Sequence, residues 1–254
     1  MTSAGKHLLV KRDAPIRIQP VLRSESWVGI VRATSSQHWV ERKKFQSNNC
    51  AHNWSSIVFG IMEKTKSVTQ LMEQFLTYIC HEIAFRLKIH PPEYYHSKRY
   101  GQHSVHENRN LQIQNYINDS VEAAGKMLAV GGLESFVFVV TDSETSVPIE
   151  RYIFHATLFT ERSTNTRDLG DKLSDLVAKI GWELGHTTVG NRRERNFKCL
   201  VVASSSKSGY MPQNGSWITC GHMELPESRK EIFSLGQVDC GMVDLKVLLH
   251  RNAS

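Results

Sequence analysis

The pattern of apolar and polar residues is most regular in residues 67–90, where apolar positions recur at helical spacing. Ser67 and Gln70 have the spacing of a capping box, and prolines at positions 91 and 92 end the pattern. Apolar side chains also occur outside the main stripe. We therefore predict a central helix that begins at Ser67 and packs on several sides.

Two further segments have the helical period. The segment from residue 111 places Tyr116 on its apolar side and is closed by Gly131 and Gly132, which suit a helix C-terminus. Residues 166–184 form a third amphipathic pattern. Three helices are expected in all.

Strand patterns alternate with these helices. Apolar runs at 136–140 and 148–159 are separated by a polar, proline-containing turn, which predicts an antiparallel hairpin. Glu150 and Arg151 stand at the head of its second strand, where we expect a charged pair at the solvent edge. Helices and hairpin around one sheet predict an α+β fold.

The last fifty residues have a different character. A strand is predicted at 197–204, and beyond Ser204 the chain is rich in Ser, Gly, Pro and Asn, with short β-like islands at 216–220 and 242–250. Long, weakly patterned segments in compact domains often carry function. Trp217, among small polar residues, has the surroundings of an aromatic anchor for a partner.

Composition separates the N-terminal part from the rest. The 254 residues suit one main domain, and no apolar run approaches the ~20 residues of a membrane span. Residues 1–66 hold eleven Lys and Arg and four Asp and Glu, which gives a net charge of +7. The rest of the chain holds twenty Lys and Arg and twenty-one Asp and Glu, which gives a net charge of −1. We interpret residues 1–66 as a basic extension of uncertain order; direct nucleic-acid binding through it is an alternative function.

The sequence lacks the usual signatures of enzymes and metal sites. The sequence contains no glycine-rich phosphate loop, nucleophile elbow or zinc-protease motif. Four histidines fall between positions 90 and 106, and Cys220 precedes His222 by two positions, but these spacings match no standard zinc site. Cys80, inside the first helix, is expected to be a buried, inert thiol. We expect no catalytic residue, metal or cofactor.

The order of these elements, with three short segments, resembles the HORMA family, and within it the accessory subunits of DNA polymerase zeta. The similarity covers residues 67–254, and its most specific segments are "HPPEYYHSKRY", "LQIQNYI" and "VPIERYIF". The resemblance implies three helices on a mainly antiparallel sheet. It also implies a C-terminal safety belt, about residues 204–254, that closes over a bound peptide.

The resemblance also implies a function and a set of residues. The protein would be a nuclear, possibly also cytoplasmic, non-catalytic adaptor of translesion synthesis and DNA repair. It would trap a proline-containing peptide of the polymerase zeta catalytic subunit and contact DNA only indirectly. The implied peptide pocket is Tyr116, Ala123, Trp217 and Thr219. A Y-family polymerase and an AAA+ remodelling ATPase are further implied partners.

Two departures from the family pattern qualify this picture. Ser174 stands where the family's polymerase adaptors usually have an arginine used in dimer contacts, which argues against self-association there. The second partner surface would lie at Ile232, Leu248 and His250, two of which lack the expected polar groups. A spindle-checkpoint or meiotic HORMA protein remains an alternative with the same fold.

Overall fold

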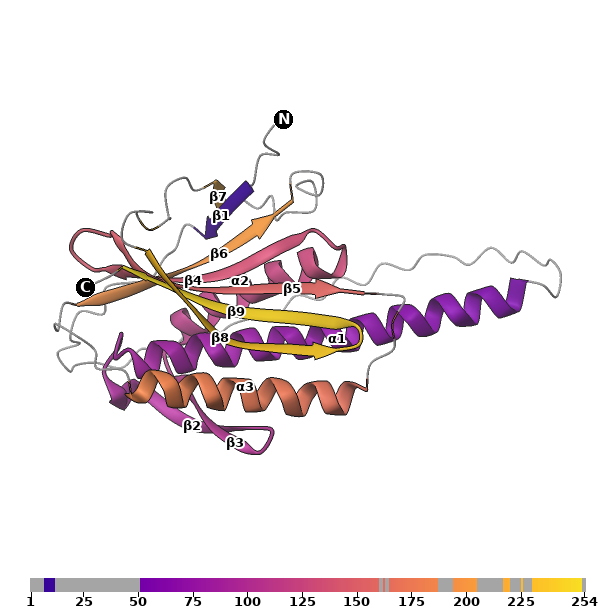
Figure 1. Ribbon diagram of the computed structural model, residues 1–254, viewed down its shortest axis with the longest axis horizontal. Helices are drawn as coiled ribbons and strands as arrows, with labels where there is room; N and C mark the ends of the chain where they lie inside the picture. Colours follow the sequence, from indigo (N-terminus) through magenta and orange to yellow (C-terminus); the bar gives the residue numbers. More distant parts are fainter. Residues whose placement is uncertain are drawn as a thin grey trace, which may run out of the picture.

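The computed structural model describes residues 7–11, 51–159, 162, 165–186, 194–204, 217–219, 225 and 230–252. Within 7–11, 51–66 and 217–219 it describes the backbone only. Three helices cover one face of a seven-stranded sheet, and a separate two-stranded hairpin lies beside them (Figure 1). The predicted α+β architecture is confirmed.

The helices form the first layer. α1 (Ala51–Arg86) is central and packs against both α2 (Leu111–Ala129) and α3 (Thr166–His186). The side chain of Asn110 accepts a hydrogen bond from the Gln112 amide at 2.9 Å and caps α2. Gly131 follows that helix with a φ of 66°, the left-handed conformation that glycine adopts without a steric penalty.

The predicted start of the first helix was wrong. α1 begins at Ala51, so Ser67 and Gln70 lie inside it and do not cap it. Two residues three positions apart also face the same side of a helix interior, so the spacing alone does not define an N-terminus. Residues 1–66 thus contribute the first sixteen residues of α1 and a strand, β1 (His7–Lys11). The division at residue 67 stays a prediction.

All strand pairs in the large sheet are antiparallel, and the order is β7-β1-β6-β4-β5-β9-β8. The central hairpin, β4 (Leu133–Asp142) and β5 (Pro148–Leu158), was predicted. Its turn is held by Asp142, whose Oδ1 accepts from the Thr145 amide at 2.9 Å. The other strands are β6 (Arg195–Ala203), β7 (Trp217–Thr219), β8 (Lys230–Cys240) and β9 (Val243–Asn252).

The two faces of the sheet carry separate apolar clusters. Alternate residues of the strands join the helices in the main core, in which Phe75, Phe138 and Tyr152 are fully buried. The intervening residues form a second cluster on the opposite face, made of Val137, Val139, Ile153, Leu200 and Val202. This alternation follows from the two-residue period of a strand.

Glu150 and Arg151 were expected at the solvent edge, and that expectation was wrong. Their exposed fractions are only 5% and 6%, because β9 covers the outer side of β5. The Glu150 carboxylate accepts hydrogen bonds from the Tyr152 hydroxyl at 2.7 Å and from Arg251 Nε at 2.9 Å. The pair therefore heads a central strand, and Glu150 links it to the C-terminal strand.

The small hairpin of β2 (Tyr95–Tyr100) and β3 (His103–Asn108) follows a one-turn 3₁₀ helix, Pro92–Tyr94. It lies against α1 and α3 and not in the large sheet (Figure 1). The structure shows a regular six-pair ladder.

Candidate functional site

The strand β1 occupies a defined position in the large sheet, between β6 and β7, which we call the β6–β7 slot. His7 to Val10 pair with Ala203 to Leu200 of β6, and Leu9 to Lys11 pair with Thr219 to Trp217 of β7. Among the described strands, β7 is hydrogen-bonded to β1 alone. The segment in the slot therefore joins β7 to the rest of the sheet.

Tyr116 of α2 reaches β6 at one end of this ladder. Its hydroxyl oxygen accepts a hydrogen bond from the Cys199 amide at 3.0 Å, and Cys199 adjoins Leu200, the register partner of Val10. Only 4% of Tyr116 is exposed, and its ring meets that of Phe197 edge-on at 5.8 Å. Burial raises the pKa of Tyr116 well above the usual value for a phenol, so the hydroxyl keeps its proton.

The other predicted pocket residues lie as follows. Trp217 is the register partner of Lys11 and Thr219 that of Leu9, both on β7. Ala123 is buried on the same side of α2 as Tyr116, two helical turns further along. The fold thus brings Tyr116 and the two β7 residues to the slot from segments about a hundred positions apart. Their role in binding stays a prediction.

The predicted second surface lies at the opposite edge of the sheet. Ile232 of β8 pairs directly with His250 of β9, and Leu248 is two residues away on the same strand, so the three share one face. Ile232 is 58% exposed, whereas His250 is 9% exposed and Leu248 packs on the outer apolar cluster. Ile232 is the accessible member of this group.

Ser174 lies on the buried side of α3 and not on its surface. It is 1% exposed, its hydroxyl donates to the Asp171 carbonyl at 2.9 Å, and it sits beneath Gly101 in the β2–β3 turn. A side chain on Gly101 would collide with the Ser174 hydroxyl. Ser174 therefore fixes the contact between α3 and the small hairpin.

We expect Ser174→Arg to destabilise the protein by about 2 kcal/mol, because a long charged side chain has no space beneath Gly101. Urea unfolding measures the change. Asp175→Arg, at an exposed neighbour, is the control and should change stability by less than about 0.5 kcal/mol beyond the loss of its contact with His103. Equal stabilities of the Ser174 variant and the native protein would contradict this packing.

The clustered histidines have partners other than metal. His103 contacts Asp175 at 2.7 Å, His96 contacts Glu107 at 3.2 Å, and both ring Nδ1 and the backbone amide of His106 lie 2.9 Å from Glu82. No group of three potential metal ligands occurs in the described ranges of the chain. Cys220 and His222 lie outside the described residues. Cys80 is fully buried, as predicted.

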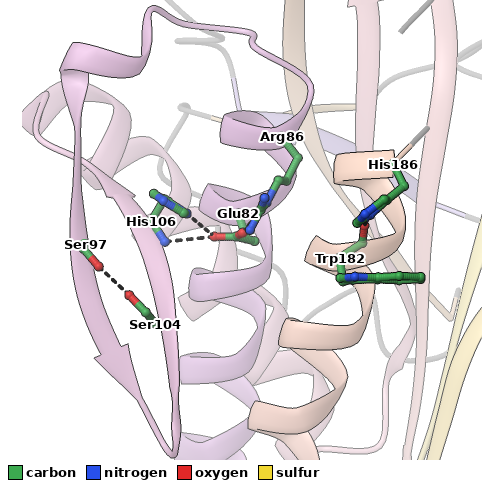
Figure 2. Close-up of polar contacts among 7 residues, drawn as sticks. All are labelled: Glu82, Arg86, Ser97, Ser104, His106, Trp182 and His186. Carbon is green, nitrogen blue, oxygen red and sulfur yellow. Dashed lines mark hydrogen bonds and ion pairs between the residues drawn. The ribbon is translucent and has the colours of Figure 1, made fainter. Parts of the chain in front are cut away.

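A shallow hollow of about 320 Å³ lies between α1, β3 and α3. Figure 2 shows Glu82 and Arg86 on one wall and Trp182 and His186 on the other. Trp182 is 64% exposed, and its ring lies 4.3 Å from that of His186. The sequence analysis did not select Trp182. Its position outside the apolar stripe of α3 was nevertheless a signal of an exposed aromatic side chain.

No described helix is long and apolar enough to cross a membrane. The sequence profile of the HORMA domain matches residues 68–196, which is half of the chain. The chain belongs to the HORMA family. The match begins within α1 and ends in β6, so both β1 and the C-terminal strands of this HORMA protein lie outside it.

Solved structures give the same fold. A chain of the mitotic checkpoint complex is 16% identical with a TM-score of 0.62, and the match covers 74% of this HORMA protein and 99% of that chain. C. elegans HTP-2 bound to the HIM-3 closure motif is 13% identical with a TM-score of 0.60, covering 75% and 92%. C. elegans HTP-1 bound to the same motif is 13% identical with a TM-score of 0.59, and the match covers 72% of this HORMA protein and 89% of that chain. No curated protein sequence matches significantly.

Sequence reasoning missed the occupant of the β6–β7 slot. The "HLLV" run is too short to be the apolar region of a signal peptide, and no periodic pattern around it predicts a strand. Its role as the strand between β6 and β7 could not be predicted from the sequence, because the space between these two strands exists only in the assembled sheet. A run of three apolar residues in a polar, basic segment was the available signal.

Proposed function

We propose that this HORMA protein is a non-catalytic adaptor that holds an extended peptide of a partner protein as an added strand in the β6–β7 slot. The single observation that carries the proposal is the slot itself. A five-residue strand lies there antiparallel to both neighbours, and β7, from the C-terminal segment, covers its far side. Main-chain hydrogen bonds on two sides suit recognition of an extended peptide.

The chain path supports retention of such a peptide. After β6 the chain forms β7 on the far side of the slot, and the following strands, β8 and β9, pair at the opposite edge of the sheet. The C-terminal segment therefore has contacts at both edges, in the manner of the predicted safety belt. A strand enclosed in this way leaves slowly, so we expect tight binding to appear mainly as a slow off-rate.

For the partner we propose a proline-containing segment of the DNA polymerase zeta catalytic subunit, with the protein serving translesion synthesis and repair in the nucleus. Support comes from the segments "HPPEYYHSKRY", "LQIQNYI" and "VPIERYIF", which form the α1 exit and β2, the start of α2, and β5. A Y-family polymerase is the proposed second partner at Ile232, and an AAA+ ATPase the proposed remodelling enzyme. DNA is contacted through these partners.

A checkpoint or meiotic role is the second candidate. It is favoured by the structural similarity to a chain of the mitotic checkpoint complex and to HTP-1 and HTP-2, which are bound to closure motifs. Binding of the full chain to a panel of synthetic peptides separates the candidates. Preference for the polymerase segment supports translesion synthesis, and preference for a closure motif supports the meiotic role.

Trp217→Ala is expected to weaken binding of the polymerase peptide by about 2 kcal/mol, a roughly thirtyfold rise in Kd. The reason is its position on β7, opposite the strand in the slot, where an aromatic side chain can anchor a peptide. Isothermal titration calorimetry with the full chain measures the change.

Trp182→Ala provides the matched control, because Trp182 is an exposed tryptophan on α3, in contact with His186 and away from β7. Its replacement should leave the Kd within about twofold of the native value. An unchanged Kd for the Trp217 variant would remove that residue from the binding site.

A further inference from the structure

We infer that the protein's own N-terminal segment, His7–Lys11, is a built-in competitor that occupies the β6–β7 slot until a partner peptide displaces it. The inference rests on the proposed peptide-binding function. We expected a foreign segment between the sheet and the C-terminal strands. The structure places residues of the same chain there, with four register pairs on the β6 side and three on the β7 side.

The segment has the properties of a peptide ligand. It lies outside residues 68–196, the part of the chain that matches the HORMA domain. It is separated from α1 by positions 12–50, and it is short, with three consecutive apolar residues between His7 and Lys11. A short extended segment with an apolar centre is the kind of sequence that adds to a sheet edge.

The connection to the rest of the chain is long enough for the segment to occupy its own slot. Positions 12–50 comprise 39 residues, which can span at most about 130 Å when extended, several times the width of a small domain. No exchange between two copies is needed. A tethered segment also acts at a high effective concentration, which a free peptide must exceed.

β1 holds β7 in the sheet, so a segment in the β6–β7 slot also stabilises β7. Among the described strands β7 pairs with β1 only, so an empty slot would leave both the β6 edge and β7 unpaired. An internal occupant satisfies both edges in the absence of a partner. A partner then binds only in the fraction of time that the slot is open, and its apparent Kd rises in inverse proportion to that fraction.

The test compares the full-length native protein with Leu9→Pro, in which proline removes a backbone donor from the middle of β1. Leu9→Val is the matched control, because valine keeps the donor and favours strands. The probes are a fluorescein-labelled synthetic peptide of residues 5–14 and the polymerase zeta peptide, each titrated by fluorescence anisotropy. Leu9→Pro should bind the 5–14 peptide at least tenfold more tightly than the native protein or Leu9→Val.

The outcomes separate the two proposals. If the 5–14 peptide binds Leu9→Pro but the polymerase peptide does not, the internal competitor stands and the partner assignment fails. If the polymerase peptide binds the native protein and Leu9→Pro equally, the internal competitor is refuted while peptide binding stands. A native dimer that becomes monomeric with Leu9→Pro, measured by light scattering, would refute occupancy within one chain.

A second variant keeps the inference testable if Leu9→Pro does not fold. Leu9 and Thr219 are register partners, so Leu9→Cys with Thr219→Cys places two thiols at a separation that a disulfide can bridge. Oxidation should fix the segment in the slot and lower peptide binding at least tenfold, and reduction should restore it. Equal binding in the two redox states would overturn the inference.

Discussion

Lowering the pH from 7.5 to 5.0 is expected to reduce the free energy of unfolding by about 4 kcal/mol through two buried histidines, His81 and His90. Burial lowers the pKa of each to about 4. For His81, the Glu107 carboxylate raises the pKa but does not offset burial. Each histidine contributes about 2 kcal/mol of this change.

The contacts of His81 explain why its charged form is disfavoured. Its Nδ1 accepts a long hydrogen bond, 3.5 Å, from the Asn108 amide, and its Nε2 has no hydrogen-bond partner among the described residues. Protonation would add a charge without a new partner and would end the bond to Asn108. His90 has its ring edge-on to Phe197 and its Nδ1 3.3 Å from the Tyr95 hydroxyl.

The direction of this pH effect follows from the number of protons that the folded and unfolded states bind. In the unfolded chain a histidine titrates near pH 6.5, whereas in the folded protein these two titrate near 4. Between these values the unfolded state binds more protons, so the stability present above pH 6.5 is lost as the pH falls toward 4.

Urea unfolding at both pH values measures the effect. His90→Gln removes one titrating group and should reduce the pH-dependent loss by about 2 kcal/mol. His155→Gln, at an exposed histidine on β5, is the control and should leave the loss unchanged. Equal losses in all three proteins would show that His90 does not account for the acid sensitivity.

The second large effect concerns the link between β5 and the C-terminal strand. Glu150→Ala is expected to destabilise the protein by about 3 kcal/mol, because it leaves the buried hydroxyl of Tyr152 and the Nε of Arg251 without their carboxylate acceptor. Burial, and then the neighbouring Glu150 charge, raise the pKa of Tyr152, so the phenol remains a donor. Chemical unfolding followed by tryptophan fluorescence measures the change.

Two variants test the cause. Glu150→Gln retains an acceptor oxygen but not the charge, and we expect a smaller loss of about 1.5 kcal/mol. Glu122→Ala breaks an ion pair with Lys126 in which both side chains are more than 60% exposed, and it should cost less than about 0.5 kcal/mol. If Glu150→Ala and Glu122→Ala were equally stable, the buried contact would contribute little.

Elements with a regular local pattern were predictable from the sequence. The apolar stripe and terminal glycines of α2, and the turn between β4 and β5, are local signals, and the structure has both elements within a few residues of the predicted positions. β8 was not predicted as a continuous strand. It is an edge strand with exposed Ile232 and Phe233 and a register shift near Gly236, so it lacks the alternation of a half-buried strand.

The burial of Glu150 and the occupant of the slot were not predictable by the same means. Glu150 is buried because β9, a hundred residues later, pairs with β5, and no local pattern contains that information. Tyr116 could be placed on the apolar side of its helix, but its bond to Cys199 joins segments 83 positions apart. The resemblance to the family supplied the candidate pocket where periodicity did not.

The position of β1 has a consequence for the order in which the polypeptide acquires its structure. Val10 and its partner Leu200 are 190 positions apart, and β7 lies later still. At about 5–20 residues per second, a ribosome needs on the order of ten seconds or more to deliver the second half of this pairing. The β1 segment is therefore synthesised long before its neighbours exist, and until they follow it is available to chaperones and to other molecules.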